Sequence, residues 1–371
     1  MTDNRTNKNT TTRPGRKGRS GRRSAADRHR RRVITVCVIM MAVLALAGIG
    51  SAAWRLTCST YGGSGDVRIY IPAEASPEAV RDTLVTRLGD SYGNRVYRLW
   101  RWRTHNDDKP SAYGSYVIRP GDKVWTVSNS LYKRRQTPVR VTVNDVRLMS
   151  QLAERVGARM AFGAEDFMLA ADTVLPAAGF ARAELFPAAF VPDTYEFYWT
   201  DSPDKVIRTL VDSRNKFWTD ERRAKAKAMG LSPAEVATVA SIVEEETRDS
   251  KDRGMVARLY LNRIAKGMKL QADPTVKFAA GNFAARRVKG DMLSTVSAYN
   301  TYRVDGLPPG PIRIPERATM DIVLNAPQHN YIFMCASPNF DGTHNYAVDY
   351  ATHRKNAAAY QAELNRRGIH H

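Results

Sequence analysis

Three consecutive carboxylates, Glu244, Glu245 and Glu246, lie at the end of a predicted helix, and helix phase separates their roles. The helix begins at Ser232-Pro233-Ala234-Glu235, a capping box with proline at the first helical position, so its phase is well defined. At about 100° per residue, Glu246 falls within the apolar stripe of the helix, Glu244 at its edge and Glu245 on the solvent side. A carboxylate against an apolar surface loses hydration, which raises its pKa and suits it to donate a proton near neutral pH.

Glu246 therefore has two interpretations, a general acid or the salt-bridge partner of Arg248 or Arg253 at the helix end. The residues that follow favour catalysis, because short segments combine amides, carboxylates, hydroxyls and aromatic rings. Aromatic faces stack on sugar rings, and amide and carboxylate groups bind sugar hydroxyls. The candidate residues for binding a sugar chain are Glu244, Asn262, Gln271, Asp273, Thr275, Tyr299, Asn300 and His344.

We expect no metal and no cofactor at this site. His344 and His353 are potential metal ligands, but no third ligand lies at a suitable spacing, and proton transfer by a carboxyl group needs no metal. We read His344 as a hydrogen-bonding wall of the cleft. The segment 306–312, Gly-Leu-Pro-Pro-Gly-Pro-Ile, lacks the Lys-Ser/Thr ending of a phosphate-binding loop and indicates a rigid loop instead.

The elements that precede this site predict an α+β fold. Within residues 65–145, apolar residues alternate near 67–71, 116–118 and 139–143, which is typical of strands, and helical periodicity lies between them. This region is therefore predicted to be a small α/β module. Residues 114–122 resemble the start of a LysM-like glycan-binding unit, and an ordinary membrane-proximal spacer is the alternative.

Residues 146–371 are predicted to form the catalytic domain, a mostly helical mixed α/β unit. Leu148, Leu152 and Val156 recur every four residues, and further helices are expected near 203–217 and 232–248. The helix that ends in the three glutamates belongs to this domain.

The charge of the chain is concentrated at its N-terminus. The chain carries 57 Lys and Arg against 37 Asp and Glu, a formal net charge of +20. Residues 1–32 hold twelve basic and two acidic residues, so about half of the net charge lies there. We predict a disordered cytoplasmic tail. A nucleic-acid-binding arm is the alternative, but the tail has no Phe, Tyr or Trp to stack on a base, so no nucleic acid is expected as a partner.

Residues 33–54 are an uncharged apolar run long enough to cross a bilayer as a helix. The basic tail predicts that its N-terminal side is cytoplasmic and that the rest of the chain is outside. A cleaved signal ending at Ser51-Ala52-Ala53 is the alternative, although the run is longer than the usual signal core. Lipid attachment at Cys58 is disfavoured by the residues before it. Whether Cys58 pairs with Cys335 stays open.

The motifs taken together resemble the endolytic murein transglycosylase family, the MltG/YceG-like proteins, over roughly residues 110–365. The matching segments are FVPDTYEF at 190–197, ASIVEEET at 240–247, LNR at 261–263, GMKLQADPTV at 267–276, YNTY at 299–302, GLPPGPI at 306–312, GTHNY at 342–346, and His353.

The resemblance implies a lytic transglycosylase acting on peptidoglycan. It would cleave the MurNAc–GlcNAc β-1,4 bond within nascent strands and leave 1,6-anhydro-MurNAc ends. Glu246 matches the essential glutamate of the family, the second of a Val-Glu-x-Glu-Thr stretch, and would act as both acid and base. Glu245 replaces the usual Lys, so we expect it to add negative charge and to raise the pKa of Glu246.

The resemblance also implies partners and a location. Peptidoglycan strands are the expected substrate, and cell-wall synthases such as penicillin-binding proteins are expected partners. The protein would be a single-pass protein of the cell (inner) membrane, anchored by residues 33–54, with a cytoplasmic N-terminus and an extracytoplasmic (periplasmic) catalytic domain. The alternative function is a non-catalytic, membrane-anchored scaffold that binds glycan within the cell-wall synthesis machinery.

Overall fold

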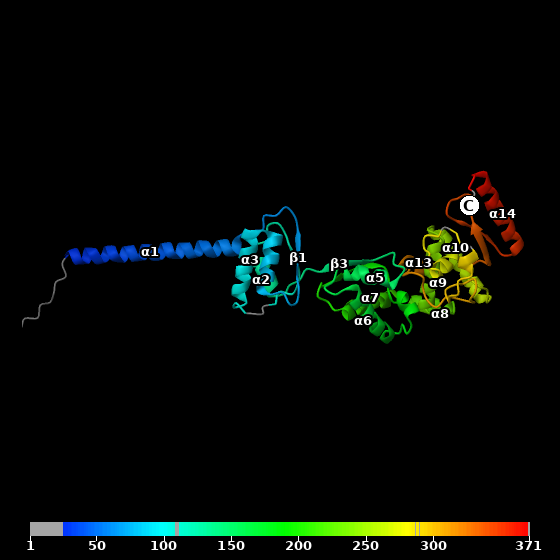
Figure 1. The fold of residues 1–371 in the computed structure, drawn as a ribbon, viewed down its shortest axis with the longest axis horizontal. Helices are drawn as coiled ribbons and strands as arrows, with labels where there is room; N and C mark the ends of the chain where they lie inside the picture. The colour runs from blue at the N-terminus through cyan, green and yellow to red at the C-terminus, as the bar shows by residue number, and fades with distance from the viewer. Residues whose placement is uncertain (1–24, 108–110, 286, 289, 370–371) are drawn as a thin grey trace, which may run out of the picture.

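The protein is elongated, with a long N-terminal helix at one end and the C-terminal helix at the other (Figure 1). The predicted basic tail falls largely within residues 1–24, outside the described part of the chain. The computed structural model describes residues 25–107, 111–285, 287–288 and 290–369.

The first helix, α1 (Ala25–Cys58), contains the whole predicted span. Within Asp27–Arg55, an 18-residue window has a mean hydropathy of 2.7 and no buried part, so the helix is long and apolar enough to cross a membrane. Because α1 begins at Ala25, it also includes the last residues of the segment that was predicted to be disordered.

Next to α1 lies a small module with its own core. Its elements run β1 (Val67–Ile71), α2 (Pro77–Leu88), α3 (Asp90–Arg103), β2 (Gly114–Ile118) and α4 (Val124–Tyr132). The strands β1 and β2 pair antiparallel, and their inward residues pack on the helices to form one hydrophobic cluster. The predicted strands and helices of this region are confirmed, and the LysM-like identity of the module stays a prediction.

The strand β3 (Val139–Val143) belongs to the second, larger core instead of the module. It pairs antiparallel with β4 (Asp193–Phe197), far along the chain, and its three valines are buried in the larger cluster. The boundary between the two cores therefore falls before Val139 and not at residue 145 as the sequence predicted. The alternation of apolar and polar residues predicts the strand correctly, but the core to which the strand belongs depends on its pairing with β4.

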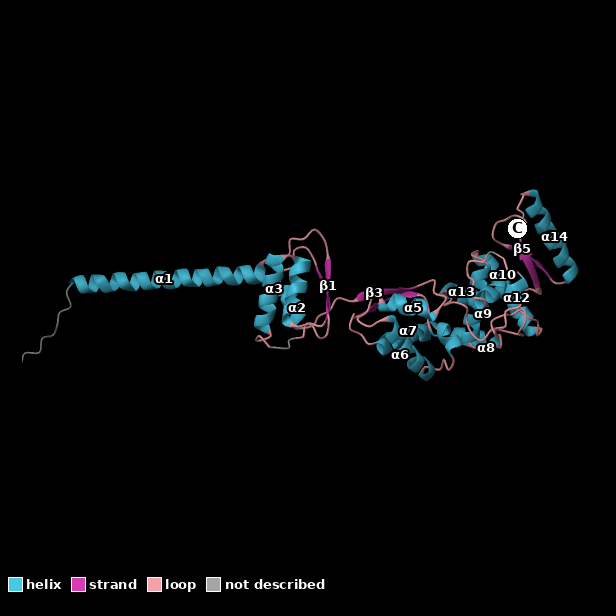
Figure 2. Ribbon diagram, viewed as in Figure 1, coloured by secondary structure: helices cyan, strands magenta, loops and turns pink. Residues whose placement is uncertain are grey.

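The rest of the chain is mostly helical, with one further antiparallel pair of strands, β5 and β6 (Figure 2). The α+β class is confirmed. The elements after β3 are α5 (Met149–Gly157), α6 (Ala164–Ala177), the 3-10 helix η1 (Ala183–Ala189), α7 (Pro203–Phe217), α8 (Asp220–Ala228), α9 (Pro233–Glu246), α10 (Ser250–Ala265), α11 (Asp273–Ala279), α12 (Gly290–Leu293), α13 (Arg317–Leu324), β5 (Phe333–Ala336), β6 (His344–Ala347) and α14 (Tyr350–Arg366).

The helix α9 is the centre of this region. The Ser232 side chain accepts a hydrogen bond from the Glu235 backbone N–H, and the Glu235 side chain accepts one from the Ser232 N–H, which confirms the predicted capping box. All residues from Val236 to Glu244 are buried, because α8, α10, α11, α13 and η1 pack around the helix. A helix buried on all sides fixes the position of the residues at its end.

The loop 306–316 crosses the end of α9 and is itself held rigidly. The Ile312 N–H donates to Ser241 Oγ in α9 at 3.0 Å, and the Ile314 N–H donates to the Val146 carbonyl at 2.8 Å. At Gly310, a Cβ atom would lie 1.8 Å from the Glu184 carbonyl oxygen, so only glycine fits there. The predicted rigid loop is therefore confirmed, and its role is to pack against the glutamate-bearing helix.

Candidate active site

The end of α9 opens into a pocket of about 350 Å³, a size that suits a small-molecule or sugar-ring ligand. The pocket lies between α9, α10, the start of α11 and the C-terminal elements β5, β6 and α14. Four predicted site residues line it, and they are Glu246, Gln271, Asp273 and His344. The other lining residues are Leu259, Tyr260, Arg263, Leu270, Tyr302, Phe333, Met334, Cys335, Ala336, Tyr350 and His353.

Glu246 is the last residue of α9 and combines burial with a single strong hydrogen bond. The Tyr260 hydroxyl donates to Glu246 Oε1 at 2.6 Å. Burial raises the pKa of Glu246 to about 7, although the Tyr260 hydrogen bond and the charge of His344 lower it; the charge of Asp273 adds to the rise. A carboxyl group with this pKa is partly protonated at neutral pH, as a general acid requires.

Tyr260 is a fixed donor for this carboxyl group. Its side chain is almost fully buried in α10, and burial together with the charge of Glu246 raises its pKa well above the usual value. The phenol therefore keeps its proton and stabilises the ionised form of Glu246.

A histidine–aspartate pair forms another wall of the pocket. His344 Nδ1 lies 2.8 Å from Asp252 Oδ2, and the Tyr346 hydroxyl donates to Asp252 Oδ1 at 2.5 Å. Burial raises the pKa of Asp252, but the hydrogen bonds from His344 and Tyr346 outweigh it, so the pKa is lowered. Burial opposes the charged form of His344, but the hydrogen bond and charge of Asp252 prevail and raise its pKa. The Asp252 contact fixes the ring orientation of His344.

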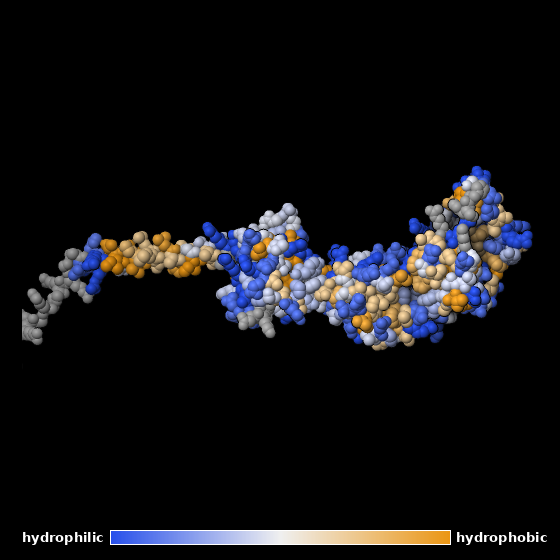
Figure 3. Space-filling model, viewed as in Figure 1, coloured by the Kyte–Doolittle hydropathy of each residue, from blue (hydrophilic) through white to orange (hydrophobic). Residues whose placement is uncertain are grey.

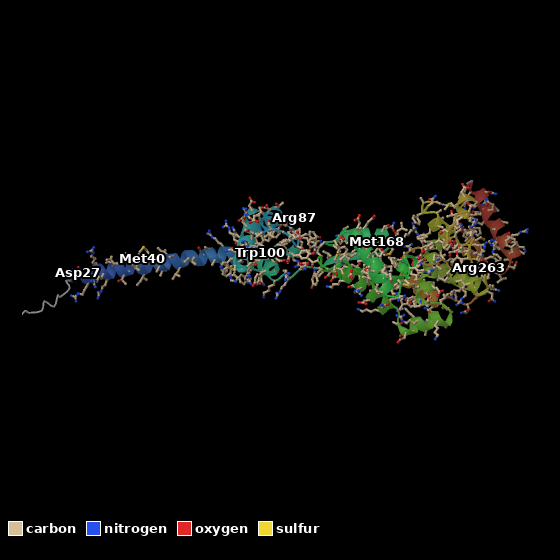
Figure 4. All side chains as sticks on the ribbon, turned by 60° about the horizontal axis from the view of Figure 1, so that its bottom comes forward. Asp27, Met40, Arg87, Trp100, Met168 and Arg263 are labelled. Carbon is tan, nitrogen blue, oxygen red and sulfur yellow. The ribbon has the colours of Figure 1, made fainter. Side chains whose placement is uncertain are left out.

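The floor of the pocket is held by Arg263, which Figure 4 labels in the C-terminal part of the molecule. Its guanidinium donates to the carbonyls of Leu270 at 2.7 Å and Ile332 at 2.6 Å. Gln271 has a φ of 51°, a left-handed conformation that is uncommon for a residue other than glycine. Functional sites are enriched in such conformations, and this one lies at the pocket.

Asp273 is the second carboxyl group that lines the pocket. Its Oδ1 accepts a hydrogen bond from the Tyr302 hydroxyl at 2.7 Å, and its side chain is exposed at the start of α11. Tyr302 therefore ties the YNTY segment to the pocket.

Glu244, which was predicted to bind substrate, is not among the residues that line the pocket. It is 7% exposed, its Oε1 accepts a hydrogen bond from the Glu316 N–H at 2.6 Å, and its Oε2 lies 3.2 Å from Arg313 Nε. Burial raises its pKa. Glu244 is a structural anchor for the loop that crosses the helix end.

Glu245 was predicted to face solvent, and that prediction is wrong. It forms ion pairs with Arg147 at 2.8 Å and with Arg313 at 2.6 Å. Segments distant in sequence cover the helix face that periodicity assigned to solvent. The two guanidinium groups balance the charge of Glu245, so the expected uncompensated negative charge beside Glu246 is absent from this part of the structure.

The alternative salt bridge of Glu246 is also not formed. Arg253 instead pairs with Glu316 at 3.1 Å and donates to Thr319 Oγ1 at 2.9 Å, and Arg248 is exposed.

Four further predicted binding residues support the site without lining it. The Asn262 side-chain amide donates to the carbonyls of His329 and Tyr331 at 2.7 and 3.1 Å. Thr275 is fully buried and lies 2.8 Å from Thr301 through their hydroxyls.

The remaining two are Tyr299 and Asn300. The Tyr299 ring packs on Phe278 at 4.7 Å between centroids. Asn300 is fully buried and donates to the carbonyls of Leu293 and Thr295, each at 2.9 Å. Several of the side chains predicted from the sequence therefore brace loops and do not line the pocket.

Sequence reasoning missed Tyr260, Asp252 and Arg263. Each lies on α10, whose pocket face carries a buried tyrosine, aspartate and arginine. Buried polar side chains need partners, but sequence alone cannot say which residues will be buried together. Cys335 of β5 also lines the pocket; it is a free thiol whose pKa is raised by burial. Cys58, the last residue of α1, is also a free thiol.

The family model described as the YceG-like family matches residues 69–359. The chain belongs to the YceG-like family. This match covers both cores and every residue of the pocket, so the expected resemblance is confirmed.

Two curated relatives of this YceG-like chain carry the same name. The endolytic murein transglycosylase of Bacillus subtilis is 34% identical over 156 residues, 42% of this chain and 41% of the relative. The endolytic murein transglycosylase of Streptococcus pneumoniae serotype 2 is 29% identical over 187 residues, 49% of this chain and 32% of the relative. The matched part therefore spans less than half of each relative.

A solved structure supports the YceG-like fold. The crystal structure of a yceG-like protein from Listeria monocytogenes matches with a TM-score of 0.52 and 22% identity, over 79% of this chain and 99% of that one.

Proposed function

We propose that this YceG-like protein is an endolytic lytic transglycosylase of peptidoglycan, with Glu246 as its single acid/base. The observation that carries the proposal is the half-buried Glu246 carboxyl group, whose pKa is raised to about 7 and which lines a pocket of sugar-ring size. The names of the curated relatives support the substrate class.

In the proposed reaction the protonated Glu246 donates its proton to the glycosidic oxygen of the MurNAc–GlcNAc β-1,4 bond as that bond breaks. The 6-hydroxyl of the same MurNAc then attacks its own anomeric carbon, and the Glu246 carboxylate removes the hydroxyl proton. The products are a GlcNAc hydroxyl end and a 1,6-anhydro-MurNAc end, and Glu246 regains its proton. Tyr260 stabilises the carboxylate between the two transfers.

The remaining pocket residues position the glycan. We assign Gln271, Asp273, Tyr302 and His344 to its hydroxyl and amide groups, because these polar side chains line the pocket. Asn262, Thr275, Tyr299 and Asn300 act indirectly, through the loops that they brace.

Asp273 provides the basis for a second candidate function. An ordinary glycosidase uses two carboxyl groups, and Glu246 and Asp273 both line the pocket. A hydrolase would add water and leave reducing ends. Against this, the Tyr302 hydroxyl already binds Asp273.

The test is digestion of purified peptidoglycan by the full chain in detergent, with the new ends identified by mass. We expect anhydro ends from the wild type and none from Glu246→Gln, whereas Glu154→Gln, at an exposed position on α5, should cleave normally. Reducing ends would indicate a hydrolase, and absence of cleavage by the wild type would indicate a glycan-binding scaffold. Equal activity of Glu246→Gln and wild type would contradict the assignment of the acid.

The same proposal includes location and partners. We assign residues 33–54 of α1 to the membrane, with the N-terminus cytoplasmic and the pocket outside, and cell-wall synthases as partners. The small module would be a LysM-like glycan-binding unit. Protease added to intact cells should degrade the pocket-bearing region and leave the N-terminal tail; protection of the pocket region would contradict this topology.

A further inference from the structure

The outer face of α3 and α4 carries exposed aromatic rings beside arginines. Trp102, Trp125 and Tyr132 are 67%, 44% and 43% exposed. Two arginines, Arg98 and Arg103, accompany them on the same pair of helices. We call these five residues the α3–α4 face.

The α3–α4 face is pre-organised by contacts within the module. The Arg103 guanidinium lies over the Trp125 ring at 4.4 Å and the Tyr132 ring at 4.8 Å, and it donates to Asn129 Oδ1 at 3.1 Å. Such cation–π contacts hold a charge and two aromatic rings together at the surface. The Trp102 ring lines the same surface hollow as Arg103, Trp125 and Tyr132, and Arg98 is exposed about one helical turn before Trp102.

The helices α3 and α4, which carry this face, contact the chain at the end of the apolar helix. The backbone N–H of Val124, at the start of α4, donates to the Ser59 carbonyl at 2.9 Å, and Arg95 of α3 donates to Ser59 Oγ at 2.7 Å. Helix α3 lies across the end of α1 in Figure 1, and Figure 4 labels its buried Trp100 beside that end. The apolar run ends at Trp54, so at 1.5 Å per residue Ser59 lies only about 7 Å further along the helix axis.

These features fit the interface between a bilayer and water. Trp and Tyr concentrate at headgroup depth, and Lys and Arg near a spanning helix are attracted to anionic lipids. Figure 3 shows a hydrophilic module surface beside the hydrophobic α1, the sequence of layers that a helix leaving a bilayer requires. Further basic residues flank α4, with Lys123 just before it and Lys133, Arg134 and Arg135 in the turn after it.

We propose that the α3–α4 face binds the phospholipid surface of the membrane that α1 spans. The rings of Trp102, Trp125 and Tyr132 would enter the headgroup layer, and Arg98 and Arg103 would bind lipid phosphates. This inference rests on the proposed membrane anchoring by α1. The module would then set the orientation of the protein relative to the membrane surface, because a single spanning helix does not fix that orientation.

The test uses the full chain in vesicles of phosphatidylcholine and phosphatidylglycerol, with lipids brominated near the headgroup to quench tryptophan fluorescence. We expect Trp102→Phe and Trp125→Phe each to remove part of the quenchable signal. Trp199→Phe, at a partly buried position packed against the larger core, is the matched control and should remove none. Trp54→Phe reports insertion of α1 separately.

The outcomes separate the two proposals. If Trp54→Phe loses signal but neither module variant loses more than the control, the α3–α4 face does not touch lipid and the inference fails while the anchor stands. If Trp54→Phe also loses nothing, the membrane anchoring itself fails.

A second measurement tests the charge and the competing ligand. Quenching should fall when phosphatidylglycerol is omitted or when Arg98→Gln is introduced, and it should not fall in Arg208→Gln, at an exposed position on α7. The fluorescence of Trp102 is obtained by subtracting the signal of Trp102→Phe from that of the wild type. This fluorescence should not change when soluble peptidoglycan fragments are added to the chain in detergent. A response to the fragments without a response to lipid would assign the α3–α4 face to glycan and overturn the inference.

Discussion

Glu246 is a half-buried carboxyl group at the end of α9 whose pKa is raised above its usual value. Burial against α10 and the pocket raises its pKa, while Tyr260 and His344 restrain the rise. A general acid with a pKa of about 7 must hold its proton at the start of each turnover, so activity depends on the protonated fraction.

The rate of cleavage should therefore fall as the pH rises above about 7. The protonated fraction of Glu246 decreases tenfold per pH unit on that side. The measurement is kcat against pH on purified peptidoglycan, with folding checked at each pH by circular dichroism. A rate that stays constant to pH 9 would contradict the role of Glu246 as the acid.

Tyr260→Phe should move this alkaline limb to higher pH and lower kcat. The hydroxyl lowers the pKa of Glu246 by donating to its carboxylate, so removal of the hydroxyl raises that pKa and withdraws stabilisation from the ionised intermediate. Tyr198→Phe, at an exposed position, is the control. An unshifted pH profile in Tyr260→Phe would show that the hydrogen bond does not tune the acid.

Glu246→Gln should make the protein more stable above pH 7. The folded-state pKa of about 7 is above the unfolded value of 4.5, so the contribution of Glu246 to stability is fully present below pH 4.5 and is lost as the pH rises through 7. Glutamine carries no charge, so its contribution does not change with pH. The free energy of unfolding of the variant minus that of the wild type should therefore be up to about 3 kcal/mol larger at pH 8 than at pH 4.5. Urea denaturation at both pH values measures this difference; equal pH dependence in both proteins would contradict the raised pKa.

At the scale of elements, the end of α9 depends on Arg313. Three carboxylates at the C-terminus of a helix oppose its dipole, and Arg313 contacts both Glu244 at 3.2 Å and Glu245 at 2.6 Å. It also pairs with Asp145 at 2.7 Å, which joins the helix end to the segment after β3.

Arg313→Ala should lower the free energy of unfolding by about 3–5 kcal/mol, because it leaves the buried Glu244 carboxylate without its cation. Adding Glu244→Gln should recover part of this loss. Arg140→Ala, which breaks an exposed pair with Glu196, should cost about 1 kcal/mol or less. Denaturation midpoints give the comparison; equal losses in Arg313→Ala and Arg140→Ala would show that Arg313 is only a surface charge.

The same elements show what sequence can predict. The start of α9 was predicted accurately because a capping box and a proline are local signals, whereas its end falls at Glu246 and not at residue 248 as predicted. The exposure of Glu245 was wrong because Arg147 and Arg313, distant in sequence, cover that side of the helix. Some of the residues that line the pocket, such as Gln271 and Asp273, were predicted from the sequence. The partners of Glu246 and His344 on α10 were not, because their positions depend on tertiary packing that no local sequence pattern encodes.

At the scale of the whole molecule, the two hydrophobic cores are separate. Leu84 lies in the core of the module and Leu210 in the larger one, and both are fully buried. Separate cores can unfold in separate steps.

Leu84→Ala should destabilise only the module, by about 2–5 kcal/mol, and Leu210→Ala only the pocket-bearing region by a similar amount. Denaturation followed by far-UV circular dichroism, with cleavage activity measured in parallel, should show two transitions that respond separately. A single transition that both variants shift equally would mean that the cores unfold as one unit.

The free thiol of Cys335 lines the pocket and can be labelled chemically. Because burial raises the pKa of this thiol, alkylating reagents should modify it slowly, and a glycan seated in the pocket should slow them further. Mass analysis of the peptide that contains Cys335 would then report occupancy of the pocket even in Glu246→Gln, in which no bond is broken. Substrate affinity can thus be followed separately from turnover, with a reporter that the chain already carries.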